Sequence, residues 1–218
     1  MASVREIKRR IRSVQNTAKI TKAMQMIAAS KMRRAQQLTL AGRPYAEKLQ
    51  GVLADLAAQF TDEWDVHPLL QKREISHTSV VHITPDRGLC GGLNANMNRT
   101  TGQFILEQQD LVSVIAVGRK GRDFMVRYGR DVRAVFIDMG DRPGLADALP
   151  IAYQIIGDYT SGKTDRVMIA YSQFVNTAIQ RPVLQQLLPV EPASLEAGQA
   201  GVCHVQCFRQ LCVVYGGW

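Results

Sequence analysis

Residues 77–94, HTSVVHITPDRGLCGGLN, decide the fold. The first half is a short run of apolar and β-branched residues, which is typical of a buried strand. The second half, from Asp86 to Asn94, is rich in glycine and leads into a segment with helical periodicity. A strand, a glycine-rich turn and a helix in this order form the repeating unit of sheets that are covered by helices.

The same alternation continues along the chain. Further strands are predicted at 111–118, 132–138 and 166–172, and helices at 94–108, 119–128 and 145–159. The segment 182–190, PVLQQLLPV, is compatible with one more strand because its prolines lie at its ends. The fold class is therefore α/β, with a mainly parallel sheet and helices on its faces.

Upstream of the sheet, residues 3–41 contain neither Gly nor Pro and predict one long helix. A heptad seam runs along it, with eight apolar residues among its ten positions. These positions are Val4, Ile7, Ile11, Val14, Ala18, Thr21, Gln25, Ala28, Met32 and Ala35. Ile20, Met24 and Ile27 widen the apolar face. The helix would be about 60 Å long, and a lone helix is marginal in water, so we expect a partner helix.

Gly42 and Pro44 are expected to kink or interrupt this helix, and the helical pattern resumes from Tyr45 to Phe60. We therefore divide the chain into a helical part at 1–60, an α/β domain at 75–195 and a tail at 202–218. The tail, VCHVQCFRQLCVVYGGW, holds three of the four cysteines and no acidic residue. It has no sustained periodicity, and we interpret it as aberrant and disordered.

The net charge of +8 is concentrated in the helical part. Residues 1–48 contain twelve Lys or Arg and two acids, a balance of +10, so the other 170 residues sum to −2. A basic arm on a nearly neutral body is expected to meet a negative partner. No apolar run approaches the roughly 20 residues of a transmembrane helix, which predicts at most peripheral membrane association. The Arg-rich start resembles a transit peptide but continues for about forty residues, which favours a structural helix.

Two segments resemble phosphate-binding loops. Residues 157–164, GDYTSGKT, match GxxxxGK[ST] literally, but a helix precedes them and a strand follows, which inverts the required order. Gly162 is better explained as a residue that ends a helix. The loop from Asp86 to Asn94 has the right strand-to-helix context, yet it lacks both the GxGxxG spacing and an acidic ribose partner. We interpret it as a tight turn that another backbone approaches closely.

Metal binding and cofactor binding are not predicted. Cys203, His204, Cys207 and Cys212 have irregular spacing and lie in the tail. No Ser/His/Asp or Cys/His nucleophile set stands out, and the four His residues are scattered. The basic helix could straddle DNA, but its Lys and Arg are interleaved with the seam instead of forming a separate block. Arg5, Lys8, Arg9 and Arg12 are interpreted as a solvated face, whereas Lys31, Arg33 and Arg34 suggest contact with an acidic protein surface.

Three stretches carry a family resemblance. The helical sequence IKRRIRSVQNTAKITKAMQMIAASKMRRAQ at 7–36, the loop DRGLCGGLNANM at 86–97 and QLLP at 186–189 are similar to those of ATP synthase gamma subunits. The resemblance covers about residues 1–200. It implies a rotor whose N-terminal helix coils against a C-terminal helix inside a ring of alternating alpha and beta subunits. The α/β domain would contact the epsilon subunit and the membrane c-ring.

The resemblance also implies roles for individual residues. Met24, Lys31, Arg33 and Arg34 would face the catalytic ring, and the loop with Asp86, Arg87, Gly88, Cys90, Gly91 and Gly92 would lie in the globular foot. Family members continue through a final strand and a long helix where this chain has residues 202–218. A frameshift near Gly201 would explain that difference, and we expect such a chain to be defective as a shaft.

The leading function is a non-catalytic rotor subunit that couples proton flow to ATP synthesis, at the cytoplasmic face of a bacterial plasma membrane. Two alternatives remain open at this point. One is a nucleotide-dependent α/β enzyme that uses the glycine-rich turns. The other is a nucleic-acid-binding helix with an appended α/β domain, which would bind DNA with a steep salt dependence.

Overall fold

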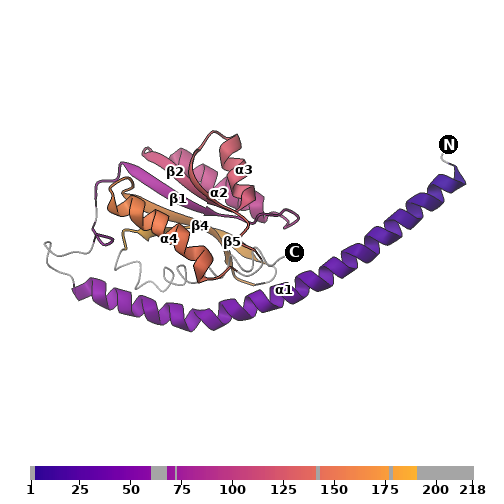
Figure 1. Ribbon diagram of the computed structural model, residues 1–218, viewed down its shortest axis with the longest axis horizontal. Coiled ribbons are helices and arrows are strands. Elements are labelled where there is room, and N and C mark those ends of the chain that lie inside the picture. Colours follow the sequence, from indigo (N-terminus) through magenta and orange to yellow (C-terminus); the bar gives the residue numbers. More distant parts are fainter. Residues whose placement is uncertain (1–2, 60–67, 72, 141–142, 177–178, 191–218) are drawn as a thin grey trace.

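The computed structural model describes residues 3–59, 68–71, 73–140, 143–176 and 179–190. A 56-residue helix, α1 (Val4–Gln59), precedes an α/β body, as Figure 1 shows. The body contains, in chain order, β1 (His77–Ile83), α2 (Leu93–Glu107), β2 (Leu111–Val117), α3 (Arg119–Arg127), β3 (Asp131–Phe136), α4 (Leu145–Thr160), β4 (Arg166–Phe174) and β5 (Gln180–Leu188).

The five strands form one sheet in the order β3-β2-β1-β4-β5. The first four run parallel, and β5 pairs antiparallel with β4. The predicted α/β class with a mainly parallel sheet is therefore confirmed. The further strand at 182–190 is also present, although it begins at Gln180. Pro182 fits within it because β5 is the last strand of the sheet and needs hydrogen bonds on one side only.

The core lies on both faces of the sheet. Alternate residues of the central strands point to opposite faces, so one strand serves two layers. On one face, Ile151, Ile155 and Tyr159 of α4 pack against a cluster that includes Val81 and Ile115. On the other face, α2 and α3 cover two smaller clusters, around Val80 and around Val114. This is a doubly wound arrangement, with α4 on the side of the sheet opposite α2 and α3 (Figure 1).

Of the two outcomes expected at Gly42 and Pro44, a kink or an interruption of α1, the interruption is wrong. The helix is continuous from Val4 to Gln59 with Pro44 inside it. Pro44 lacks an N–H, so it removes the helical hydrogen bond to the carbonyl of Leu40. One missing bond bends a long helix more readily than it ends one, and α1 is bowed in Figure 1.

Helix α1 presents its seam to solvent along its N-terminal half. Val4 is 71% exposed, Val14 is 68% exposed, and every residue from Ser3 to Ile27 is exposed. The same face becomes covered further along, where Ala35, Thr39 and Gly42 are buried. The Thr39 hydroxyl donates to the carbonyl of Ala35 at 2.9 Å, so its burial leaves no unsatisfied donor. The apolar stripe of α1 thus remains available over several turns.

Candidate functional site

The residues expected to contact a partner on α1 do not share one face. At about 100° per residue, Lys31 and Arg33 project from nearly opposite sides of the helix. Met24 and Arg34 lie closer to the side of Lys31. Met24 is 43% exposed, Arg33 and Arg34 are exposed, and Lys31 is half-buried. The three basic residues therefore spread over nearly half of the circumference of α1, and their role as a contact surface stays a prediction.

The seam residues differ in their environment along α1. Ala28 is half-buried and Met32 is 37% exposed, so both lie near the point where the face becomes covered. Ala35 is buried, whereas the apolar members nearer the N-terminus are exposed, namely Val4, Ile7, Ile11, Val14 and Ala18. Exposed apolar stripes of this length are typical of surfaces that another protein covers.

The loop after β1 is held in place by Asp86, at the carboxyl edge of the sheet. One carboxylate oxygen of Asp86 accepts the Arg119 N–H at 2.8 Å, and the other accepts the Asp138 N–H at 2.9 Å. The Arg119 guanidinium in turn pairs with the Asp138 carboxylate at 2.9 Å. Asp86 therefore joins the loops that follow three neighbouring parallel strands. The expected strand-to-helix turn is present, but no other backbone approaches its glycines, because a Cβ atom added at Gly88, Gly91 or Gly92 would meet side chains or nothing within 4 Å. The partners of Asp86, 33 and 52 residues away, have no local signal in the sequence.

The glycines of this loop serve its shape. Gly91 has φ +60, a conformation that L side chains rarely adopt, and it lies two residues before the first residue of α2. Leu89 also has a positive φ, +63, and is 80% exposed. Arg87 is exposed, whereas Gly88 and Cys90 are half-buried. The loop thus displays one apolar and one cationic side chain at the surface of the body.

A hollow of about 350 Å³ lies between this loop, the end of β4 and the start of β5. It occupies the point between β1 and β4 where the strand order reverses, which is where doubly wound sheets usually bind ligands. Its lining residues are Cys90, Gly91, Gly92, Leu93, Asn96, Met97, Ser172, Ile179, Gln180 and Pro182. None of them is Lys, Arg, His, Asp or Glu, so the hollow offers no charged group to a nucleotide.

The GxxxxGK[ST] match is the C-terminal end of a helix. Gly157 lies inside α4, and Gly162, with φ +71, lies two residues after its last residue. The Gly162 N–H donates to the Tyr159 carbonyl at 3.2 Å, and the Lys163 N–H donates to the Asp158 carbonyl at 3.0 Å. Helix C-termini direct carbonyls, not N–H groups, outward. The predicted inversion is confirmed, and the segment cannot cradle a phosphate.

Sequence reasoning missed a buried polar cluster around His82. With Asn98 Oδ1 as acceptor at 2.9 Å, the His82 Nε2 carries the proton, and Nδ1 accepts the Thr101 hydroxyl at 3.0 Å. Complete burial lowers the pKa of His82 to about 4, although the hydrogen bond that His82 donates to Asn98 opposes the shift. The neutral imidazole therefore joins β1 to α2. A histidine between apolar strand residues was the available signal, but its partners are 16 and 19 residues away.

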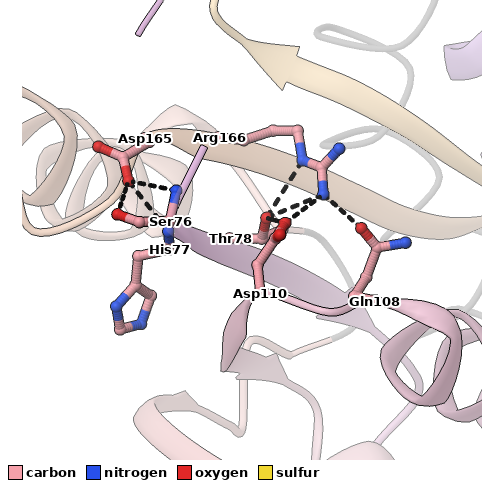
Figure 2. A network of polar contacts seen from close by, with 7 residues as sticks. All are labelled: Ser76, His77, Thr78, Gln108, Asp110, Asp165 and Arg166. Atoms are coloured by element: carbon pink, nitrogen blue, oxygen red, sulfur yellow. Dashed lines mark hydrogen bonds and ion pairs between the residues drawn. The ribbon is translucent and has the colours of Figure 1, made fainter. Parts of the chain in front are cut away.

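A second network lies at the amino edge of the sheet (Figure 2). The Arg166 guanidinium pairs with Asp110 at 3.0 Å and donates to the Thr78 hydroxyl and to Gln108 Oε1. Asp110 also accepts the Thr78 hydroxyl at 3.2 Å. These residues stand at the starts of β1, β2 and β4. The network ties three strands together, and Oδ2 of its carboxylate is bound by both Thr78 and Arg166.

Asp165 lies at the same edge of the sheet, directly before β4. Its Oδ2 accepts the Ser76 N–H at 3.1 Å, the Ser76 hydroxyl at 2.7 Å and the His77 N–H at 3.0 Å. Desolvation raises the pKa of Asp165, but the hydrogen bonds from Ser76 and His77 lower it by more, and the net shift is downward. The ionised carboxylate therefore holds the chain that enters β1.

Within the described residues no cluster of His, Cys, Asp or Glu is arranged to hold a metal ion. The candidate zinc residues, Cys203, His204, Cys207 and Cys212, lie outside the described part of the chain, as does the whole predicted tail. Among the helices that the structure describes, none is long and apolar enough to cross a membrane.

Comparisons with known proteins give one consistent result. A family model described as ATP synthase matches residues 3–206, which extends a few residues past Gly201. The ATP synthase gamma chain of Dehalococcoides mccartyi (strain ATCC BAA-2266 / KCTC 15142 / 195) is 59% identical over 199 residues, covering 91% of this chain and 70% of that one. The ATP synthase gamma chain of Herpetosiphon aurantiacus is 46% identical over 214 residues, covering 94% and 71%.

A solved structure is also similar in fold. A chain in the central stalk/c-ring structure of the Tetrahymena thermophila mitochondrial ATP synthase matches with a TM-score of 0.64 and 24% identity. The match covers 91% of this chain and 90% of that chain. It therefore includes both the long helix and the α/β body.

Proposed function

Since this chain belongs to the ATP synthase gamma-chain family as a gamma subunit of the F-type enzyme, we propose that its long helix and body are those of the rotor that couples proton flow to ATP synthesis. The expected defect of the shaft concerns residues 202–218, which lie outside the described part of the chain, and it stays a prediction. The observation that carries this proposal is the 59% identity to a gamma chain across 91% of the chain, because it includes both the long helix and the body. In this proposal the chain is non-catalytic, and phosphate chemistry takes place on other subunits.

The shape of α1 supports a mechanical role. A straight helix of 56 residues would be about 84 Å long, which is far longer than a helix needs to be to cover the sheet of the body. Its faces differ, with an apolar seam on one side and Arg33 projecting from the other. A rotating helix with unlike faces presents each surrounding subunit with a different surface in turn. Each orientation then favours a different conformation of the neighbouring catalytic site, which is a population shift driven by rotation.

The features of the body favour a role in anchoring over a catalytic role. The acidic groups at its two edges, Asp86, Asp110 and Asp165, are each engaged by backbone or side-chain donors. The hollow at the strand-order reversal lacks charged residues. Both features favour the rotor over the nucleotide-dependent enzyme. Lys and Arg that surround α1 instead of forming a block also favour the rotor over a DNA-binding helix.

The partners follow from this proposal. Helix α1 would lie inside the ring of alpha and beta subunits, with Met24, Lys31, Arg33 and Arg34 facing acidic loops of that ring. The body, including the loop at Asp86, would contact the epsilon subunit and the membrane c-ring. The chain would be peripheral to the membrane through this complex, at the cytoplasmic face of a bacterial plasma membrane.

Co-expression with alpha and beta subunits tests the proposal. We expect a tagged chain to recover both subunits, with one copy of the chain per ring. Recovery of neither subunit, under conditions in which a gamma chain from Dehalococcoides mccartyi recovers both, would contradict it.

ATP-binding measurements on the isolated chain distinguish the rotor from the nucleotide-dependent enzyme. We expect no saturable ATP binding by calorimetry, and no difference between the unsubstituted chain and Lys163→Ala. Specific ATP binding that Lys163→Ala abolishes would favour the enzyme.

A further inference from the structure

The segment that leads from α1 into β1 is fastened to the body at several points. Its described parts are residues 68–71 and 73–76, which we call the anchor segment. The Val190 N–H donates to the Leu69 carbonyl at 3.2 Å, and the Tyr159 hydroxyl donates to the Gln71 carbonyl at 2.9 Å. Arg73 and Ser76 make further contacts, with the end of α4 and with the residue before β4.

Arg73 and Tyr159 form the centre of this attachment. The Arg73 guanidinium lies 5.2 Å from the centroid of the Tyr159 ring, and its Nη1 donates to the Tyr159 carbonyl at 3.0 Å. That carbonyl is in the last turn of α4, where helix carbonyls lack intrahelical partners and attract cations. Tyr159 is fully buried, and it therefore holds the anchor segment through its ring, its hydroxyl and its backbone.

Asp165 fastens the other end of the anchor segment. It accepts three hydrogen bonds from Ser76 and His77, and its own N–H donates to the His77 carbonyl at 2.9 Å. Arg73 adds a favourable charge interaction with Asp165. The contacts thus join α4, the loop before β4 and the chain entering β1 into one unit. A pull on the anchor segment is resisted by two elements of the body at once.

Helix α1 has few other points of attachment among the described elements. The sheet and its three helices pack against one another, whereas α1 forms no extended interface with any of them. The chain connects α1 to the body through the anchor segment, so the anchor segment is a route by which force passes between the two parts.

We propose that Arg73, Tyr159 and Asp165 are positioning residues that transmit rotation between the α/β body and α1. This inference rests on the proposed rotor function and adds to it the place where the two parts are mechanically joined. A loose anchor segment would allow α1 to lag behind the body. Rotation of one part would then turn the other incompletely, even in a complex that is fully assembled.

The test uses the assembled synthase in membrane vesicles, with this chain as its gamma subunit. ATP hydrolysis and ATP-driven proton pumping are measured on the same sample, after the amount of assembled complex is quantified. Arg73→Gln removes the cation, and we expect a loss of proton pumping per ATP hydrolysed. Arg73→Lys keeps a cation above the ring and should restore part of the loss. Arg122→Gln is the matched control, because Arg122 pairs with Asp123 at an exposed site on α3.

Four outcomes are informative. A lower pumping-to-hydrolysis ratio for Arg73→Gln alone supports the inference, since a merely structural role would reduce the amount of complex and leave the ratio unchanged. An unchanged ratio in assembled Arg73→Gln complex overturns the inference. If Arg73→Gln does not assemble, Tyr159→Phe decides in the same way, because it removes only the hydroxyl that reaches Gln71. If the unsubstituted chain does not couple, the proposed rotor function fails and the inference fails with it.

Discussion

Gly121 lies directly against His82. A Cβ atom added at Gly121 would stand 2.5 Å from His82 Cδ2 and 2.6 Å from the Thr84 hydroxyl oxygen. The Gly121 N–H also donates to that hydroxyl at 2.8 Å. The contact brings α3 onto β1 at the point where His82 holds α2, so one small residue sets the spacing of three elements.

Gly121→Ala is therefore expected to destabilise the fold. The His82 ring is fully buried and hydrogen-bonded on both sides, so it cannot move away. Overpacking of this kind costs about 1–3 kcal/mol, measured as the free energy of unfolding in urea. Gly157→Ala is the matched control, because a Cβ there meets nothing within 4 Å and alanine is the better helix former. Equal stability of the two variants would refute the packing argument.

The buried His82 predicts a pH dependence of stability. Its pKa is about 4 in the folded chain and about 6.5 when unfolded, so the unfolded state binds more protons between these values. The contribution of neutral His82 is complete above pH 6.5 and is lost as the pH falls towards 4, by about 3 kcal/mol in total. Urea unfolding at a series of pH values should show this slope, and His82→Gln should flatten it between pH 4.5 and 6.5. The same slope in both proteins would assign it to other groups.

The strand starts in Figure 2 give a prediction on charge burial. Arg166→Gln leaves Asp110 without its cation in a site where both side chains are less than one-quarter exposed. We expect a loss of about 1–3 kcal/mol in the free energy of unfolding, because a partly buried carboxylate loses its partner. Arg122→Gln breaks a more exposed pair with Asp123 and should cost less than about 1 kcal/mol. Similar losses for the two would mean that the amino-edge network contributes no more than a surface pair.

Apolar periodicity was sufficient to predict the α/β body, because the strands from β1 to β4 and the helices between them carry their own patterns. The strand order and the antiparallel β5 depend on long-range pairing, such as Tyr171 with Val183, and no local pattern encodes it. The interruption that was one of the two outcomes expected at Pro44 was wrong because a local rule was applied to a helix with many intact hydrogen bonds on both sides. Asp86 was recognised as part of the turn after the first strand, whereas Arg119 and Asp138 were not linked to it, since folding alone brings them to it.

The basic residues of α1 give a prediction for the complex. Replacing Lys31, Arg33 and Arg34 together with Gln should weaken association of this chain with the alpha–beta ring. Each exposed ion pair is worth about 0.2–1 kcal/mol, so the loss of three pairs should lower the affinity by about 3- to 150-fold at low salt. The difference should shrink as ionic strength rises, because added salt screens exposed charges. Binding of each variant to a surface-immobilised alpha–beta ring is measured at two or more salt concentrations.

The matched control replaces the same number of charges nearer the N-terminus, at Arg5, Lys8 and Arg9, which are exposed. We expect a smaller effect there, because these residues are interpreted as a solvated face. If both triple variants bind with equal affinity, Lys31, Arg33 and Arg34 act only through net charge.

Direct observation of rotation tests the central claim, that this chain is the rotor. A label is attached at Lys163→Cys, an exposed position after α4, in a chain whose other cysteines are replaced by serine. The labelled chain is assembled as the only gamma subunit with immobilised alpha and beta subunits. We predict that ATP drives rotation of the label in one direction, at a rate that follows ATP hydrolysis. Steady ATP hydrolysis by a complex that contains this chain, with a label that does not turn, would contradict the account.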